Sequence, residues 1–254
     1  MINRNGLLTL INREMQRFMR VFVQTLISPW INAVLYIFIF GFVVGQKIES
    51  IAGVPYIMFV LPGILMLNVL SSSFQQTAFS LYFKRFARHI EELLTAPLSD
   101  AEILIGHVVA AVARAVIVGA GIFAIAIFFD AAQVVHLGWF LFYVVGVASL
   151  FALIGLLIGL WSDSFEQLSI LNTFIITPLT YLGGMFNSID MLPAAAQQIV
   201  RWNPFFYFVD GLRYSMTGVS EANRLIGVGV IVGLNIIFFG VLWVLFHKGW
   251  RLRG

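Results

Sequence analysis

Long apolar segments alternate with short polar breaks along this chain of 254 residues. An α-helix rises about 1.5 Å per residue, so about 20 apolar residues cross the ~30 Å hydrocarbon core of a membrane. The segments of suitable length are residues 22–45, 56–81, 103–129, 137–161, 168–186 and 225–247. The pattern therefore predicts an all-α integral membrane protein with six transmembrane helices.

Residues 3–20, ahead of the first apolar segment, have helical amphipathic spacing. One side carries Leu7, Leu8, Ile11, Met15, Phe18 and Met19. The other side is polar and rich in arginine, which favours a helix lying in the anionic cytoplasmic interface. A signal peptide is the alternative, and it is disfavoured because the next apolar segment is too long and lacks a small-x-small cleavage site.

Residues 83–96 form a charged segment between the second and third apolar segments. Its apolar residues share one helical face: Phe86, Ile90, Leu93 and Leu94. On the polar side, Arg88 can pair with Glu91 or Glu92. The pattern predicts a helix that ends at Pro97, followed by a capping box, Ser99 to Glu102, that starts the next helix. Such a segment lies outside the bilayer, either as a solvated linker or as a contact for a soluble partner.

Residues 187–222 are too polar and too often interrupted by proline to cross the membrane. They predict two short re-entrant helices that enter one membrane face and are separated at Asn203-Pro204, with Pro193 ahead of the first. Asp210 and Arg213 are three residues apart and predict a local ion pair. That pair suits a helix cap or solvated surface as well as a gate.

Polar side chains interrupt two of the apolar segments. The second carries Asn68, Ser72, Gln75 and Gln76, and the fifth carries Thr173, Thr177, Thr180 and Tyr181. Polar groups in lipid need partners, so these stripes indicate either a translocation pathway or close helix packing. Arg114 lies inside the third segment and needs a partner there. We consider a carboxylate such as Glu14, or an anionic substrate or lipid.

Composition agrees with a membrane protein, since 60% of the residues are hydrophobic and the mean hydropathy is +0.95. The chain has no cysteine, which excludes disulfides and thiolate chemistry. Under the positive-inside rule, the basic residues predict cytoplasmic N- and C-termini and do not suggest nucleic-acid binding. The segments then inside hold Arg4, Arg13, Arg17, Arg20, Lys84, Arg85, Arg88, Lys248, Arg251 and Arg253. Those outside hold Lys47, Arg201, Arg213 and Arg224.

Several kinds of catalytic chemistry lack their motifs. The three lysines follow no glycine-rich phosphate-binding loop, and the zinc-protease and serine-hydrolase motifs are missing. The four histidines are scattered along the chain. We therefore expect no catalytic residue, no metal site and no cofactor in this chain, and we do not expect an enzyme.

Three stretches together resemble the permeases of ABC-2-type transporters, in particular the bacterial subgroup with nodulation-type and daunorubicin-type permeases. They are RHIEELLTAPLSDAEILIGHVVAAVAR, TPLTYLGGMFNSIDMLP and NPFFYFVDGLR. The resemblance implies the membrane half of an exporter in the bacterial inner membrane, which moves an amphipathic lipid, glycolipid, glycan or drug. Two separate ATP-binding-cassette ATPase subunits would hold ATP and magnesium.

The resemblance also assigns roles to segments. Residues 83–96 would be the coupling helix, with Arg85, Arg88, Glu91 and Glu92 against the ATPase. The polar residues of the second and fifth segments would line the pathway. A second permease copy would complete the pore, and we expect a homodimer, with a heterodimer as the alternative. A transporter or channel without an ATPase is the main rival function; a membrane enzyme and a scaffold subunit are weaker ones.

Overall fold

A computed structural model describes residues 3–252 of the chain. Within this range, six helices are long and apolar enough to cross a membrane, which confirms the predicted fold class. They are Val23–Val44, Tyr56–Phe86, Asp100–Ile127, Leu137–Trp161, Phe165–Met185 and Arg224–His247. Arg253, which entered the charge count, lies outside the described residues.

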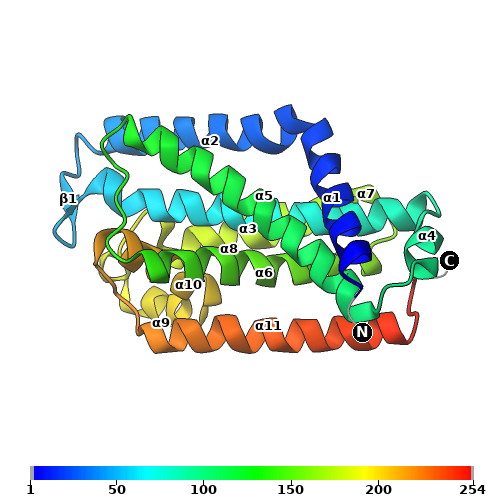
Figure 1. The fold of residues 1–254 in the computed structure, drawn as a ribbon. Coiled ribbons are helices and arrows are strands. Elements are labelled where there is room, and N and C mark those ends of the chain that lie inside the picture. Colours follow the sequence, from blue (N-terminus) through cyan, green and yellow to red (C-terminus); the bar gives the residue numbers. More distant parts are fainter. Residues whose placement is uncertain (1–2, 253–254) are drawn as a thin grey trace.

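The helices form an elongated bundle whose two ends differ (Figure 1). One end holds α1 (Arg4–Arg20), α4 (Ile90–Thr95) and both ends of the described chain. The opposite end holds the short strands β1 (Ser50–Ile51) and β2 (Val54–Pro55), together with α9 (Ala194–Trp202). Segments far apart in sequence therefore meet at the end that carries α1 and α4.

Helix α3 (Tyr56–Phe86) forms the centre of the bundle, and most of its side chains are buried. It packs most extensively against α5 (Asp100–Ile127), α6 (Leu137–Trp161) and α10 (Pro204–Thr217). Gly155 of α6 faces α3 closely, and a β-carbon there would overlap the Thr77 hydroxyl. That hydroxyl donates a hydrogen bond to the Ala152 carbonyl at 2.7 Å. Small residues let the two backbones approach.

The first and fifth spans are not continuous α-helices. The first joins α2 (Ser28–Tyr36) to π-helical segments at Val23–Ile27 and Ile37–Val44. The fifth joins α7 (Phe165–Leu171) and α8 (Thr177–Thr180) to π-helical segments at Asn172–Ile176 and Tyr181–Met185. A π-helical turn holds more residues than an α-helical turn, so side-chain spacing along these spans departs from the α-helical pattern. The sixth span, α11 (Arg224–His247), is a regular helix.

The charged segment 83–96 differs from the single helix that we predicted. Helix α3 continues to Phe86, the chain then turns at Arg88 with φ +57°, and α4 begins at Ile90. The predicted common face is wrong because this turn separates Phe86, which is 74% exposed, from the buried Ile90 and Leu93. The Arg88 pairing is also absent among the described residues, and Glu92 pairs with Arg13 at 3.1 Å.

The capping box at the start of α5 is present. The Ser99 hydroxyl accepts a hydrogen bond from the Glu102 backbone N–H at 3.3 Å, and the Glu102 carboxylate accepts one from the Ser99 N–H at 2.7 Å. The same carboxylate also accepts a hydrogen bond from the Asn3 backbone N–H at 2.5 Å. The cap therefore ties the start of α1 to the start of α5.

Between the fifth and sixth spans the chain forms a short 3-10 turn, Ile189–Met191, and then α9 and α10. Pro193 precedes α9, and Pro204 is the first residue of α10. The Asn203 side chain accepts a hydrogen bond from the Phe205 N–H at 3.0 Å, and its amide donates to the Leu179 carbonyl at 2.7 Å. These bonds fix the break between the two helices against the fifth span.

Candidate functional site

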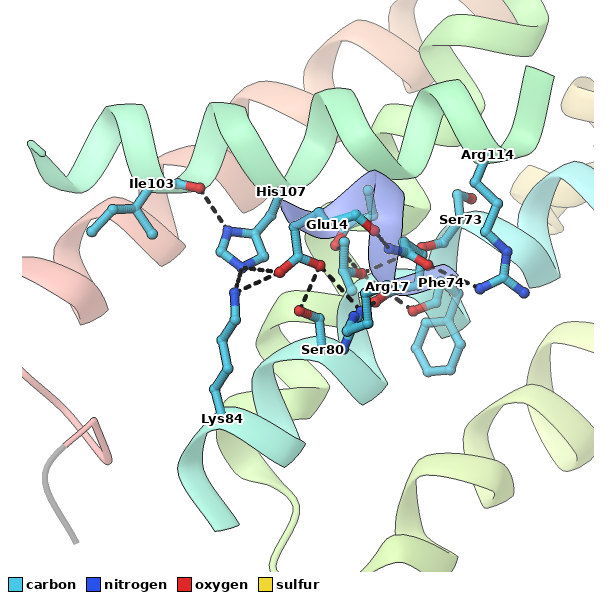
Figure 2. A network of polar contacts seen from close by, with 12 residues as sticks. Glu14, Arg17, Ser73, Phe74, Ser80, Lys84, Ile103, His107 and Arg114 are labelled. Atoms are coloured by element: carbon cyan, nitrogen blue, oxygen red, sulfur yellow. Dashed lines mark hydrogen bonds and ion pairs between the residues drawn. The ribbon is translucent and has the colours of Figure 1, made fainter. Parts of the chain in front are cut away.

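A buried polar network centres on Glu14 of α1, which is only 1% exposed (Figure 2). Its carboxylate accepts hydrogen bonds from the Lys84 ammonium at 2.6 Å and the Ser80 hydroxyl at 2.8 Å, both from α3. The Arg17 guanidinium lies 3.1 Å from the same carboxylate. The network therefore fastens α1 to the central helix through one acidic side chain.

His107 of α5 completes this network, as Figure 2 shows. Its Nε2 lies 2.9 Å from the Lys84 ammonium, and its Nδ1 lies 2.8 Å from the Ile103 carbonyl. An ammonium only donates hydrogen bonds and a carbonyl only accepts them. Nε2 is therefore the acceptor, Nδ1 carries the proton, and the imidazole in this arrangement is neutral.

The surroundings of Glu14 favour its ionised form. Burial on its own would raise the pKa of this carboxyl. Positive charge, from His107 when protonated and from Lys84 and Arg17, outweighs burial and lowers the pKa to about 2. Glu14 is therefore a carboxylate at neutral pH, already paired with two cations.

Arg114 of α5 does not pair with Glu14, which corrects that sequence-based expectation. Its Nη1 donates to the Gln76 side-chain oxygen at 3.1 Å, and its Nε has no hydrogen-bond partner. Glu14 is unavailable because Lys84 and Arg17 already surround its carboxylate. Arg114 is 6% exposed and forms no ion pair with any carboxylate of residues 3–252.

A polar cavity of about 250 Å³ lies between the first span, α3 and the fifth span. Five of the eight residues predicted for the pathway line it: Asn68, Ser72, Gln75, Thr177 and Tyr181. Arg114 and residues of the first span, Gln24, Ser28, Asn32 and Tyr36, complete the polar lining. The hydroxyls of Tyr36 and Tyr181 lie 2.7 Å apart and join the first and fifth spans beside it.

The other three predicted pathway residues lie outside this cavity. Gln76 lines a second, adjacent cavity and donates a hydrogen bond to the Glu14 carbonyl at 3.3 Å. Thr180 is fully buried and donates to the Ile176 carbonyl, whereas Thr173 is exposed. Thr173 and Thr180 therefore do not share this cavity with Thr177, because the π-helical turns rotate them away from it. The pathway role of the predicted residues stays a prediction.

The four residues predicted for ATPase contact lie around the end of α3 and in α4. Arg85 donates hydrogen bonds to the carbonyls of Gly159, Leu160 and Ser162, so it satisfies carbonyls at the C-terminus of α6. Arg85, Arg88 and Glu91 line a cleft of about 470 Å³ that also includes Arg251 near the chain end. Glu91 and Glu92 are exposed. Their contact with an ATPase stays a prediction.

Asp210 and Arg213 of α10 are buried and 3.9 Å apart, as an ion pair in the predicted position. The Asp210 carboxylate accepts hydrogen bonds from residues 220–222, and Arg213 Nε donates to the Phe59 carbonyl at 3.1 Å. The Arg213 guanidinium also lies 3.7 Å from the centre of the Phe59 ring. This pair ties α10 to α3 and to the loop before α11.

Sequence reasoning missed the network of Glu14, Lys84 and His107. The buried face of α1 consists of Leu10, Glu14 and Phe18, whereas Leu8 and Met19 of the predicted apolar stripe are exposed. One signal was available, since Glu14 lies four residues from Leu10 and from Phe18 and is the one acidic residue of this helix. An acid on the buried face of a helix requires a buried cation.

Among residues 3–252, no group of three or more histidine, aspartate or glutamate side chains is arranged to hold a metal ion. The chemistry of the described site consists of polar cavities, cations and one paired carboxylate. The fold and these features define a multi-pass helical membrane protein with a polar interior beside its first, second and fifth spans.

Comparison with known proteins identifies the family. Residues 5–217 match the model of the ABC-2 type transporter family, so the chain belongs to that family. It is 38% identical over 241 residues to the inner membrane transport permease YadH of Escherichia coli, and the aligned region covers 95% of this chain and 94% of the relative. It is 26% identical over 223 residues to nodulation protein J of Rhizobium leguminosarum bv. viciae, with 85% and 84% covered.

The family confirms the resemblance noted in the sequence. The chain is a multi-pass inner-membrane protein and the membrane component of an ABC transporter. Permeases of this family are not enzymes themselves, and they work with ATP-binding-cassette ATPase partners in which ATP hydrolysis resides.

Proposed function

We propose that this chain is the permease subunit of an ATP-driven exporter that moves an amphipathic substrate across the bacterial inner membrane. Two ATPase subunits bind ATP and magnesium on the cytoplasmic side, and a second copy of this chain completes the pore. Both termini, α1 and α4 face the cytoplasm, in accord with the distribution of basic residues. The alternative is a transporter or channel that needs no ATPase.

The observation that carries the proposal is the exposed tip formed by residues 86–92 beside the 470 Å³ cleft. A phenylalanine that is 74% exposed lies there next to exposed charged side chains, and this composition suits a docking surface for a soluble protein. The tip is also the direct continuation of α3, the helix that lines the polar cavity. ATPase binding here would act on the helix that borders the proposed pathway.

The test of ATPase coupling uses the complex purified in mild detergent, with ATP hydrolysis and export both measured. Glu91→Lys changes a carboxylate that forms no ion pair among the described residues, so its effect reports on the partner. Glu92→Lys also breaks the pair with Arg13, and it is therefore tested together with Arg13→Glu. We expect the Glu91 variant to hydrolyse ATP with little export, or to lose the ATPase.

Glu49→Lys is the matched control, because Glu49 is an exposed carboxylate in the loop at the opposite end of the bundle. It should leave export unchanged. Full export by the Glu91→Lys variant would refute the coupling role. Purification of an active transporter without any ATPase would favour the alternative function.

The proposed pathway is tested by a pair of substitutions in one span. Thr177→Phe places a ring in the 250 Å³ cavity, whereas Thr173→Phe places the same ring on an exposed side of the same span. We expect at least a tenfold loss of export for the first variant and little change for the second, at equal membrane abundance. Equal export by both variants would exclude the cavity from the pathway.

A further inference from the structure

Arg114 is a buried cation for which residues 3–252 supply no counter-charge. Its contact to the Gln76 amide is neutral, and its Nε has no partner. Burial of a guanidinium without an anion is costly, so such residues persist where they bind something. Nothing in the established family role assigns a ligand to it.

Arg114 lies on the wall of a cavity of about 570 Å³ between α1, α3 and α7. Two further arginines of α1, Arg17 and Arg20, line the same cavity, and no carboxylate does. The described residues offer Arg20 no ion pair, and Arg17 shares the single charge of Glu14 with Lys84. The cavity therefore carries a net positive charge.

The cavity also has an aromatic part, beside the polar side chains of residues 24, 25, 75 and 76. Phe79 and Phe83 of α3 and Phe165 of α7 belong to this part, with the Phe79 and Phe165 rings 5.1 Å apart. The volume lies within the range of about 300–1,000 Å³ that holds small molecules. A lining that combines three arginines with several phenylalanines matches a molecule with an anionic head and a hydrocarbon body.

The two cavities adjoin, since Gln24, Gln75 and Arg114 line both. We propose that the 570 Å³ cavity binds an anionic amphiphile, with its phosphate or carboxylate on Arg114 and Arg20 and its hydrocarbon against Phe79 and Phe165. The step from a bound ligand to a transported substrate rests on the proposed function above. Binding itself does not depend on any ATPase.

The experiment titrates the full chain in detergent with dioleoyl phosphatidylglycerol and, separately, with dioleoyl phosphatidylcholine, and reads the bound lipid by native mass spectrometry. The two lipids share their acyl chains, so the affinity ratio reports on the headgroup. Charge-assisted hydrogen bonds make a preference of about tenfold for the anionic lipid reasonable. Arg114→Gln should abolish this preference, and Arg114→Lys should keep part of it, because lysine retains the charge but not the planar fork.

Arg4→Gln is the matched control, since it removes the same charge from an exposed position of α1 that does not line the cavity. Equal loss of preference in the Arg4 and Arg114 variants would mean general attraction of lipid to a basic surface, and would overturn the proposal. A fall in the dimer fraction of Arg114→Gln with an unchanged lipid preference would overturn it too, in favour of a subunit contact.

The source of the anion is tested by displacement of bound phosphatidylglycerol with dodecyl phosphate and with inorganic phosphate at equal concentration. We expect displacement by dodecyl phosphate alone, weakened by Phe79→Ala. Equal displacement by inorganic phosphate would mean that the site binds a small anion, and it would overturn the proposal of a bound amphiphile. ATP hydrolysis by the complex is measured separately, so a missing ATPase would refute the proposed function without touching the binding result.

Discussion

Removal of the Glu14 charge should destabilise the protein more than any change of an exposed acid. Glu14→Gln keeps the shape of the side chain but leaves Lys84 and Arg17 without their shared anion. Lys84 is the more affected cation, because its side chain is only 11% exposed, while that of Arg17 is 35% exposed. Helix α1 should consequently loosen from α3 and α5.

The size of the effect follows from the burial of this network. Removal of one partner from a buried ion pair costs about 3–5 kcal/mol, because the other charge stays buried and unpaired. Arg17 can gain hydration through its exposed part, so the expected loss of unfolding free energy lies near the lower end of this range, at about 3 kcal/mol. An exposed acid such as Glu91 should change stability by no more than about 0.5 kcal/mol on the same substitution.

The assay is unfolding by sodium dodecyl sulfate in mixed micelles, followed by the fluorescence of the six tryptophans and by helical circular dichroism. Glu14→Gln, Lys84→Met and the double variant form a cycle, with Glu91→Gln as the control. The double variant should recover at least half of the loss, because it no longer contains the unpaired ammonium. A Glu14→Gln variant within about 1 kcal/mol of the original protein would refute the buried pair.

The same cycle predicts a pH dependence with a definite sign. Folding lowers the pKa of Glu14 from its ordinary value of 4.5 to about 2, so between these values the unfolded chain binds more protons. The stabilisation is therefore present above about pH 4.5 and is lost as the pH falls toward 2. The stability difference between the original protein and Glu14→Gln should shrink over that window, and a constant difference would contradict the pKa.

Three further outcomes follow from contacts described above and are measured by the same unfolding assay. Gly155→Ala should cost about 1–3 kcal/mol, because its β-carbon overlaps α3, whereas Gly229→Ala, with open space around it, should be neutral or slightly stabilising. Arg213→Lys should be destabilising although the positive charge is retained, since one ammonium does not reach both the Phe59 and the Gly184 carbonyls that the guanidinium contacts. Ser99→Ala should cost about 1 kcal/mol through loss of the helix cap, and an unchanged midpoint would refute that role.

The parts of the fold that follow local rules could be predicted from the sequence. Apolar segments of membrane length gave the six spans, and the Ser99 capping box gave the start of α5. The break at Arg88 could not be predicted, because a left-handed arginine has no local signature comparable to glycine or proline. The apolar residues of the sequence keep a helical spacing across Arg88, although the backbone leaves the helix there.

Of the candidate site, the sequence predicted only those polar residues that lie within apolar segments, because polar groups in lipid need partners. This reasoning found Asn68, Thr177 and Arg114, which do line cavities. It did not find their partners, because Glu14 and Lys84 are 70 residues apart and pair only in the folded bundle. It also treated the fifth span as a regular helix, so Thr173 was placed on one stripe with Thr177, although Thr177 alone of these two lines the cavity.

The backbone irregularities of this protein gather where the proposed pathway lies. Among the described residues, every π-helical segment belongs to the first or the fifth span, and these two spans line the polar cavity opposite α3. Such segments often mark functional positions in helices. Helix α3, in contrast, is one helix from Tyr56 to the exposed tip at Phe86. Because α3 both lines the cavity and reaches the proposed ATPase contact, movement of α3 by a bound ATPase would change the shape of the cavity.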